Sequence, residues 1–443
     1  MDGIPVLHVP YTFFPDQPGG TEIYVAALIA DMRKHGYSGV VAAPAESEST
    51  YTHDDVRVHR FKKNPFPSLD AAYGAPDEIA AESFRKILRQ VKPRIVHIHA
   101  HTAAVSERLA DEAISFGAKL FFSYHTPTAS CIRGTMMFMG ETICDGTLDA
   151  RRCSICTLQV HGIPGWAGKA VTNLPSSISL MLGARVPRQI VTALRIPALV
   201  AEAHGRFHSL MKKCDRVVAV CQWVMEMLAA NGVPAGKLKL CRQGLPSDAE
   251  GRDPAPDRNG GRGPGPMRLG YFGRLDPTKG LDVVLDALGR IPHVPLILDV
   301  YGIEQPGSAD YVSRLQTRAD SRVSFRKPVQ SSAINRAMAE CDFIVVPSQL
   351  PETGPLVVYE AFGAGTPVLG SRAGGIAELV ADGVDGVLIA PHDRQAWANE
   401  IATLATDRDR VARLRNGIRA PRTMRDAAME MAAHYRSVLA SVA

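Results

Sequence analysis

The sequence predicts an α/β protein with two doubly wound parallel sheets. Short apolar segments alternate with helix-like segments along most of the 443 residues, a rhythm typical of parallel strands connected by helices. The rhythm stops near Pro246 and restarts at Met267. A chain of this length is also too long for one ordinary hydrophobic core. We therefore expect two α/β domains of similar design.

The first predicted domain covers residues 1–246. Its expected buried strands are Val6–Pro10, Gly39–Ala43, Arg94–Ile98, Lys119–Tyr124 and Arg216–Val220. The helix-like segments between them are Glu22–His35, Asp77–Gln90 and Ser106–Phe116. Because strands and helices alternate, we expect a parallel sheet with helices packed against it.

Residues 247–266 are rich in glycine and proline, without hydrophobic periodicity, which predicts a linker. The second predicted domain, residues 267–420, contains six strand candidates: MRLGYFG, PLILDVYG, RVSF, DFIVVPS, TPVLG and GVLIA. Residues 421–443 look helical, and we expect this helix to pack back on the N-terminal domain. Ligands of open α/β sheets bind at the carboxyl ends of strands, so we expect the two domains to face each other across a cleft.

Composition excludes several classes of protein. The sequence has no run of 18 apolar residues, so we expect no membrane-spanning helix. The N-terminus lacks a basic segment followed by an apolar one, so we expect no secretory signal and a cytoplasmic location. The net charge of +5 is too small to indicate a nucleic-acid partner, and no nucleic-acid-binding motif is present.

A phosphate site is predicted in the sequence GYFGRLDPTKG, residues 270–280. A strand ends near Gly273, the following turn carries Arg274 and Lys279, and a helix begins near Gly280. The N–H groups at a helix start attract negative charge, and the two side chains add fixed positive charge. This junction suits a diphosphate, although a surface loop with two solvated cations is the alternative.

Two glutamates follow in the same predicted domain. Glu352 comes after the strand DFIVVPS, and Glu360 lies eight positions later on the next helix. Glu360 is suited to accept hydrogen bonds from ribose hydroxyls, and Glu352 is placed to reach the sugar. Two unrelated surface glutamates are the alternative interpretation.

The helix that carries Glu360 begins with a Gly-Pro pair, Gly354 and Pro355. Proline is tolerated in the first turn of a helix because the first N–H groups have no partner within it. The N–H groups near Gly354, Leu356 and Val357 are therefore expected to bind a second face of the diphosphate.

In the N-terminal half, the sequence PGGTE at residues 18–22 follows the first strand and opens a helix. Gly19 and Gly20 allow a ligand to approach the backbone closely, which again favours phosphate. A simple tight turn is the alternative.

Histidines gather at the ends of two predicted strands. His97, His99 and His101 alternate in VHIHAHT and therefore share one face of the strand and its exit. A metal site is conceivable, but we favour core and cleft-lining roles for His97 and His99. His125 ends the next strand and is expected to face the cleft, as a catalytic group or as a structural histidine.

The ordered motifs GGTE, GRLDPTKG, PETGPLVVYEAFGAGTPVLGS and GGIAELVADGVDGVLI resemble the retaining glycosyltransferases of family 4. The resemblance covers nearly the whole chain and is strongest from Gly270 to Ala390. It implies the GT-B fold, which has two facing Rossmann-like domains, and diphosphate contacts at Arg274 and Lys279. It further implies a sugar contact at Glu352, a ribose contact at Glu360 and a place for His125 close to the transferred sugar.

The sequence departs from the family pattern at several positions. Arg326 and Lys327 precede Pro328 where a glycine is usual, and this loop lies near the nucleotide base in relatives, so the base stays open. Cys221 replaces a common serine, and Gln243 replaces a common asparagine. Neither change removes a group that the chemistry requires.

The resemblance implies transfer of a hexosyl unit from a nucleoside diphosphate sugar to a hydroxyl acceptor, with retention at the anomeric carbon. The acceptor would be a glycan or a lipid-linked sugar in bacterial polysaccharide or glycolipid assembly. Cations of the protein would stabilise the leaving diphosphate, so we expect no catalytic divalent metal. A phosphorylase or epimerase on the same fold, or a non-catalytic sugar-nucleotide sensor, is the alternative.

A four-cysteine insert is predicted at residues 126–160. Its cysteines follow the pattern C-x12-C-x8-C-x2-C at Cys131, Cys144, Cys153 and Cys156. Four thiolates can hold a structural zinc ion in a tetrahedron. An iron–sulfur cluster or ordinary thiols are the alternatives.

Residues 157–201 contain no aspartate or glutamate but several cations and a tryptophan: Lys169, Arg185, Arg188, Arg195 and Trp166. A cationic amphipathic segment suits an anionic membrane surface, which predicts a peripheral contact with the inner face of the cell membrane. A helical segment packed on the sheet with solvated charges is the alternative.

Overall fold

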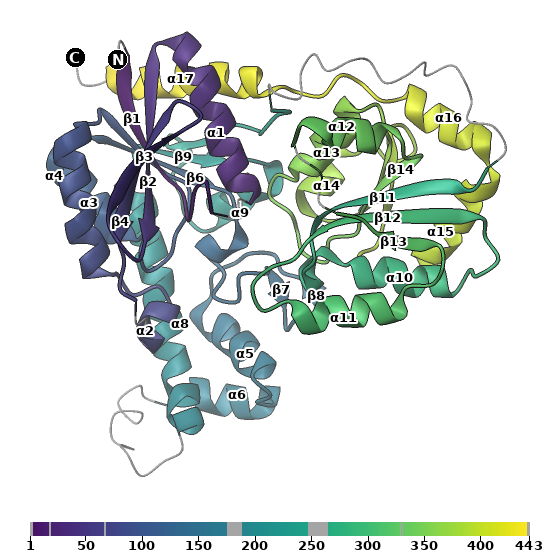
Figure 1. Cartoon of the computed structure of the whole chain (residues 1–443). Helices are drawn as coiled ribbons and strands as arrows, with labels where there is room; N and C mark the ends of the chain where they lie inside the picture. Colours follow the sequence, from purple (N-terminus) through teal and green to yellow (C-terminus); the bar gives the residue numbers. More distant parts are fainter. Residues whose placement is uncertain are drawn as a thin grey trace. The chain divides into compact units, whose positions relative to one another are not determined.

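The computed structural model describes residues 3–16, 19–65, 68–174, 188–246, 265–327, 329 and 331–440 (Figure 1). The predicted linker lies outside the described residues except for its last two, and Pro18, Arg185 and Pro328 also lie outside them. So does the side chain of Arg188. The chain divides into two compact units, Met1–Arg242 with Ala428–Ala443 and Gln243–Ala427.

The first unit contains an eight-stranded sheet in the order β10-β9-β6-β5-β1-β2-β4-β3. All neighbouring strands are parallel except β3, which pairs antiparallel with β4. The strands are β1 Ile4–Val9, β2 Tyr37–Ala45, β3 Ser49–His53, β4 Val56–Lys62, β5 Ile95–Ile98, β6 Lys119–Tyr124, β9 Arg216–Ala219 and β10 Leu238–Leu240.

Helices connect these strands and bury their apolar faces against the sheet. Leu7 of β1, Val96 of β5 and Phe122 of β6 are fully buried in one core with Phe84 and Leu109 from two of these helices. The helices of this unit are α1 Gly20–Met32, η1 Arg33–His35, α2 Leu69–Ala72, α3 Glu78–Val91, α4 Glu107–Phe116, α8 Arg188–Lys213 and α9 Gln222–Ala230.

A compact insert lies between β6 and α8 of the first unit. Its elements are η2 Pro127–Ala129, β7 Met137–Phe138, β8 Thr142–Ile143, α5 Ala150–Val160 and α6 Gly165–Thr172. Helix α5 packs on α6 and α8. Helices α5 and α6 and the N-terminal part of α8 extend away from the sheet of the same unit (Figure 1). A small core around Leu158 of α5 and Ile196 and Val200 of α8 joins the insert to α8.

The second unit contains a six-stranded parallel sheet in the order β13-β12-β11-β14-β15-β16. Its strands β11 Met267–Arg274, β12 Leu296–Ile303, β13 Val323–Phe325, β14 Phe343–Val346, β15 Val368–Ser371 and β16 Gly386–Ile389 confirm the six predicted strands. Counted along the chain, the order is 3-2-1-4-5-6, that of a dinucleotide-binding sheet, with its switch point between β11 and β14.

The helices of the second unit cover both faces of this sheet. They are η5 Pro277–Lys279, α10 Leu281–Gly289, α11 Ala309–Arg318, α12 Ser331–Ala339, α13 Leu356–Gly363, α14 Gly374–Leu379, α15 Arg394–Thr406 and α16 Arg408–Asn416. Cores lie on the two faces, one around Trp397 and Leu298, the other around Ile344 and Val358.

The last helix, α17 Met424–Ala440, enters the first unit from Ala428 onward. Its Tyr435 is fully buried there, and the Tyr435 hydroxyl lies 2.6 Å from His97 Nδ1. In the described parts of the chain, none of the helices has both the length and the apolar character that crossing a membrane requires.

Candidate active site

The switch point of the second unit brings two loops together. Strand β11 ends at Arg274, and the loop after the neighbouring strand β14 continues to Glu352. The backbone N–H of Gln349 in this loop donates to the carbonyl oxygen of Thr278, 2.8 Å away, which joins the loop to η5. Open α/β sheets bind ligands at this position because the connections that follow the two strands leave toward opposite faces of the sheet.

An ion pair lies at this junction. The Lys279 Nζ atom is 2.5 Å from Glu352 Oε1, and the Ser348 hydroxyl donates to the same carboxylate at 2.6 Å. Both side chains of the pair are mostly buried. Burial favours the neutral carboxyl, but Lys279, Ser348 and Arg274 outweigh this effect and hold the pKa of Glu352 below its ordinary value. Glu352 is therefore ionised at neutral pH.

The position of Lys279 depends on Gly280. This glycine has φ +71°, and a Cβ atom there would collide with the carbonyl oxygen of Pro347 at the end of β14. The missing side chain thus lets the η5 turn lie against the strand end and brings Lys279 to Glu352.

Gly280→Ala should lower the affinity for the predicted diphosphate ligand at least 10-fold, because the strained residue must move the η5 turn away from Pro347. Gly289→Ala is the matched control, because a Cβ at this position in α10 meets no atom within 4 Å. Calorimetric titration with UDP measures both variants. Equal affinity of Gly280→Ala and wild type would show that the turn does not shape the site.

The backbone of Glu352 is held by a pair of glycines, Gly374 and Gly375. The N–H of Gly375 donates to the carbonyl oxygen of Glu352 at 2.6 Å. Gly374 has φ +48°, and its Cβ would lie only 2.7 Å from that oxygen. The turn before α14 therefore fixes the loop that carries the carboxylate.

Helix α13 begins beside this loop with Pro355 as its N-cap. The N–H groups of Leu356 and Val357 lie in its first turn, where the helix offers them no partner. Val357 and Glu360 are both half-buried and three positions apart, so they share one face of the helix. Gly354 packs closely against the side chain of Gln243.

Two predicted glycine roles receive less support from geometry. A Cβ at Gly273 would meet its nearest neighbour at 3.6 Å, an ordinary contact, so the backbone does not require glycine there.

In the first unit, Gly19 is the N-cap of α1, and its N–H donates to the Glu22 carboxylate at 2.8 Å. Because Glu22 places a negative charge at this helix start, a phosphate at the Gly19 and Gly20 turn would lie beside a carboxylate. The phosphate contact of these two glycines stays a prediction.

His125 follows β6 and is almost completely buried. His125 Nε2 lies 3.1 Å from His99 Nδ1, and the Tyr24 ring lies 4.8 Å away between centroids. Burial lowers the pKa of His125 to about 3. The imidazole is therefore neutral at physiological pH, and it can hydrogen-bond a ligand but cannot act there as an imidazolium acid.

The other histidines are also engaged. His97 contacts the Tyr435 hydroxyl and, at 2.7 Å, the Ser123 hydroxyl. His101 Nδ1 lies 2.9 Å from the carbonyl oxygen of Ala129. His8, His97 and His99 are, among the described residues, the group of three potential metal ligands with nitrogens within 4.8 Å of one another. Five of their six ring nitrogens already form hydrogen bonds with other buried side chains, so this cluster does not favour a metal.

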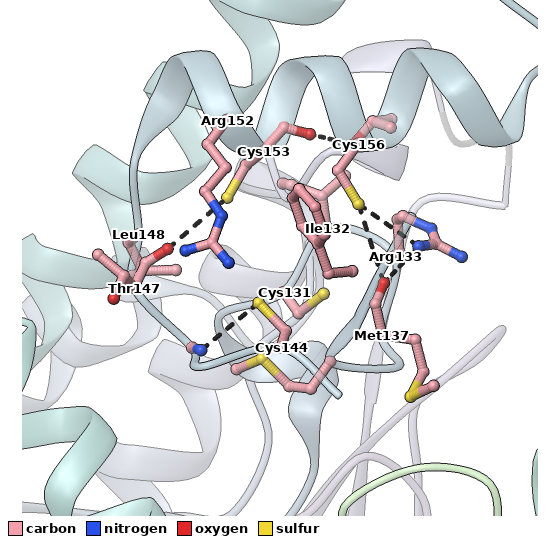
Figure 2. Close-up of a pocket in the computed structure, with 14 residues that line it drawn as sticks. Cys131, Ile132, Arg133, Met137, Cys144, Thr147, Leu148, Arg152, Cys153 and Cys156 are labelled. Carbon is pink, nitrogen blue, oxygen red and sulfur yellow. Dashed lines mark hydrogen bonds between the residues drawn. The ribbon is translucent and has the colours of Figure 1, made fainter. Parts of the chain in front are cut away.

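The four predicted cysteine ligands line one pocket of the insert (Figure 2). Their sulfur atoms do not converge: among the described residues, no three of them lie within 4.8 Å of one another. The sulfur of Cys156 accepts the N–H of Met139 at 3.1 Å, and the thiol of Cys153 is directed toward the carbonyl oxygen of Thr147. A tetrahedral zinc ion needs sulfurs about 3.8 Å apart, given Zn–S bonds of about 2.3 Å. The arrangement thus does not support the predicted zinc site.

The cationic segment ends in an apolar surface. Trp166 is 77% exposed, and Val160, Leu174 and Ile190 are also exposed on or beside α5, α6 and α8. Lys169 is exposed on α6, whereas Arg195 pairs with Asp70 at 2.5 Å. One of the predicted cations is therefore neutralised within the protein.

Sequence reasoning missed Ser348. The hydroxyl of Ser348 reaches the Glu352 carboxylate because both belong to one short loop after β14. Their spacing of four positions within a strand-end loop is a signal that the sequence contains. The spacing of residues gives no such signal for the contact between Lys279 and Glu352, because 73 positions separate them.

Family comparisons agree with these two units. The Glycosyl transferase 4-like domain model matches residues 19–242, just over half of the chain, and the Glycosyl transferases group 1 model matches residues 257–420. The D-inositol 3-phosphate glycosyltransferase of Xylanimonas cellulosilytica is 34% identical over 59% of this chain and 65% of its own length. The enzyme of the same name from Stackebrandtia nassauensis is 34% identical over 42% of this chain and 40% of its own length. The chain thus spans less than two thirds of either relative.

Solved structures share the fold. Anabaena HepE in complex with UDP and glucose has a TM-score of 0.62 and 18% identity, covering 98% of this chain and 100% of its own. Sucrose-phosphate synthase from Thermosynechococcus elongatus has a TM-score of 0.65 and 18% identity, covering 99% and 100%. The predicted fold class is confirmed. The chain therefore belongs to the glycosyltransferases that combine a glycosyl transferase 4-like domain with a group 1 domain, and it has the GT-B fold.

Proposed function

We propose that this protein transfers a hexosyl unit from a nucleoside diphosphate sugar to a hydroxyl acceptor, with retention at the anomeric carbon. The observation that carries the proposal is the grouping of Arg274, Lys279 and Glu352 at the switch point of the second sheet. Fixed cations at the carboxyl ends of the strands suit a diphosphate that gains negative charge as it leaves.

The reaction breaks the bond between the anomeric carbon and the diphosphate oxygen. The acceptor oxygen attacks from the same face, and its proton passes to the leaving phosphate oxygen, giving a glycoside and a nucleoside diphosphate. Arg274, Lys279 and the first N–H groups of α13 stabilise the charge on the leaving group. These groups supply positive charge without a divalent metal, so activity is expected to persist in EDTA.

Glu352 and His125 have supporting roles in this proposal. The ionised Glu352 accepts hydrogen bonds from the sugar hydroxyls, because its depressed pKa prevents it from donating a proton at neutral pH. The neutral His125 hydrogen-bonds a hydroxyl near the reacting carbon. The half-buried Glu360 binds the ribose from α13.

The test is a transfer assay with UDP-, GDP- and ADP-hexoses, beginning with UDP-glucose because the similar HepE structure contains UDP and glucose. We expect one donor to be consumed with release of its nucleoside diphosphate. NMR of the product should show the anomeric configuration of the donor. An inverted product would contradict the retaining mechanism. Binding of a sugar nucleotide without turnover by any acceptor tested would favour a sensor, and conversion of the free donor would favour an epimerase.

The acceptor is proposed to be a glycan or a lipid-linked sugar. The exposed apolar residues of the insert, Trp166 and Val160, would contact the membrane that holds a lipid-linked acceptor. Tryptophan suits the interface of a bilayer, and Lys169 on the same helix suits anionic headgroups.

We expect the protein to float with vesicles that contain anionic lipid at low salt. Trp166→Ser should reduce the bound fraction several-fold, because the exposed indole supplies much of the apolar area available to the bilayer. Val384→Ser is the control, since Val384 is also exposed but lies in the second unit. Equal flotation of wild type and Trp166→Ser would show that the exposed surface around Trp166 does not bind the membrane.

A further inference from the structure

Three buried histidines of the first unit form a continuous hydrogen-bonded row. His8 Nδ1 lies 3.0 Å from His99 Nε2, and His99 Nδ1 lies 3.1 Å from His125 Nε2. In both pairs the ring centroids are 5.3 Å apart and the planes are inclined by 19° and 31°. The rings therefore meet edge to edge, as in-plane N–H···N hydrogen bonds require. The row runs from β1 through the end of β5 to the residue after β6.

Each ring in this row is neutral. Burial lowers the pKa of His8 and His125 to about 3 and the pKa of His99 well below its ordinary value. A neutral imidazole carries one N–H and one acceptor nitrogen. His99, which uses both nitrogens within the row, must therefore donate to one neighbour and accept from the other.

Two arrangements satisfy both hydrogen bonds. In the first, all three rings carry the proton on Nε2, so His125 donates to His99 and His99 donates to His8. In the second, all three carry it on Nδ1, and both bonds run in the opposite direction. A mixed set leaves two N–H groups or two lone pairs facing each other in the core, which costs the energy of an unmade buried hydrogen bond.

We propose that His8 and His99 are positioning residues that couple the tautomer of His125 to their own through this row. The tautomer decides whether His125 Nδ1 donates or accepts a hydrogen bond, and thus which group of a sugar it can bind. The row does not depend on the proposed transferase function. The effect of the row on catalysis rests on that proposed function.

The same core offers a matched control. His97 stacks on His99 with ring centroids 4.0 Å apart, yet its own hydrogen bonds go to Tyr435 and Ser123. Ser123→Ala removes a hydrogen bond from this core without touching the row. A general loosening of the core would appear in both Ser123→Ala and His99→Phe, whereas loss of the row would appear only in the latter.

The direct test is the long-range ¹H–¹⁵N spectrum of the full chain labelled with ¹⁵N-histidine, with signals assigned through His8→Phe, His99→Phe and His125→Phe. The wild type should show the same tautomer for all three histidines. His99→Phe should change the nitrogen shifts of His125, and Ser123→Ala should leave them unchanged. Different tautomers in the wild type, or unchanged His125 shifts in His99→Phe, would overturn the proposal.

Kinetics test the link to catalysis separately. His99→Phe should lower kcat about 10-fold, the effect of one lost hydrogen bond, with little change in the KM of the donor. In a His125→Phe background the same change should have no further effect, because His99 acts through His125. Additive losses would contradict the positioning role. If the chain transfers no sugar at all, the proposed function fails, while the spectrum still decides whether the row exists.

Discussion

Replacing Lys279 with alanine should lower kcat/KM for sugar transfer roughly 10²- to 10³-fold, the effect of removing one preorganised group that stabilises transition-state charge. Lys279 lies at the switch point of the second sheet, where its ammonium group contacts Glu352. In the proposed mechanism, the variant loses the cation that faces the leaving diphosphate. It also leaves the ionised Glu352 with fewer partners, which weakens donor binding through repulsion of the phosphates.

The control for this variant is Lys34→Ala, because Lys34 also pairs with an acidic residue but its side chain is 59% exposed. Lys279→Arg should recover part of the activity, since it restores the charge without the same reach. Thermal unfolding should accompany the assay, because removing one partner of a buried pair is itself destabilising. A folded Lys279→Ala protein with full activity would exclude the proposed role of this cation.

Acidification should destabilise the first unit strongly. His8 and His125 have a pKa of about 3 in the folded protein and an ordinary value of 6.5. Between these values the unfolded chain binds more protons than the folded one, so the free energy of unfolding falls as the pH falls below about 6.5. The loss is about 1.4 kcal/mol per pH unit for each histidine. At pH 5 it reaches roughly 4 kcal/mol for the two together.

Urea unfolding at pH 7 and pH 5, followed by hydrogen exchange in peptides of the first unit, measures this loss. The free energy of unfolding at pH 7 minus that at pH 5 should be about 2 kcal/mol smaller in His8→Phe than in the wild type. His293→Gln should leave it unchanged, because His293 is exposed in the second unit. An equal difference in wild type and His8→Phe would show that His8 is not kept neutral by the fold.

The sequence predicts most of the fold because buried parallel strands are continuous apolar runs. The segment FIVV of β14 is an example, and all of its residues are buried. Strand β4, with the sequence VRVHRFK, was missed because three of its seven residues are cationic and a fourth is histidine. The fold accommodates Arg60 in the interior, where its guanidinium donates to the carbonyl oxygen of Phe13 and pairs with Asp16 at 3.0 Å. A strand of this kind depends on partners that are distant in sequence.

The candidate site could be predicted in part. Arg274 and Glu352 follow strands that end at the same edge of a doubly wound sheet, so strand order brings them near each other. The contact between Lys279 and Glu352 depends instead on the left-handed backbone of Gly280 and its approach to Pro347, which spacing does not reveal.

For the cysteines, the sequence predicts that the residues lie near one another but not where their side chains point. Their spacing fits a metal site, and the chain does bring all four to one pocket. Whether sulfurs converge depends on side-chain directions, and Cys156 is held by the N–H of Met139 rather than turned toward the other thiols. Hydrogen bonds within the insert thus decide a question that the sequence pattern left open.

The most direct test of the account is a crystal structure of the full chain with UDP. We expect the diphosphate at the carboxyl ends of β11 and β14, within hydrogen-bonding distance of Arg274, Lys279 and the first N–H groups of α13, with the ribose at Glu360. A diphosphate bound elsewhere, with Lys279 still paired only to Glu352, would contradict the proposed site.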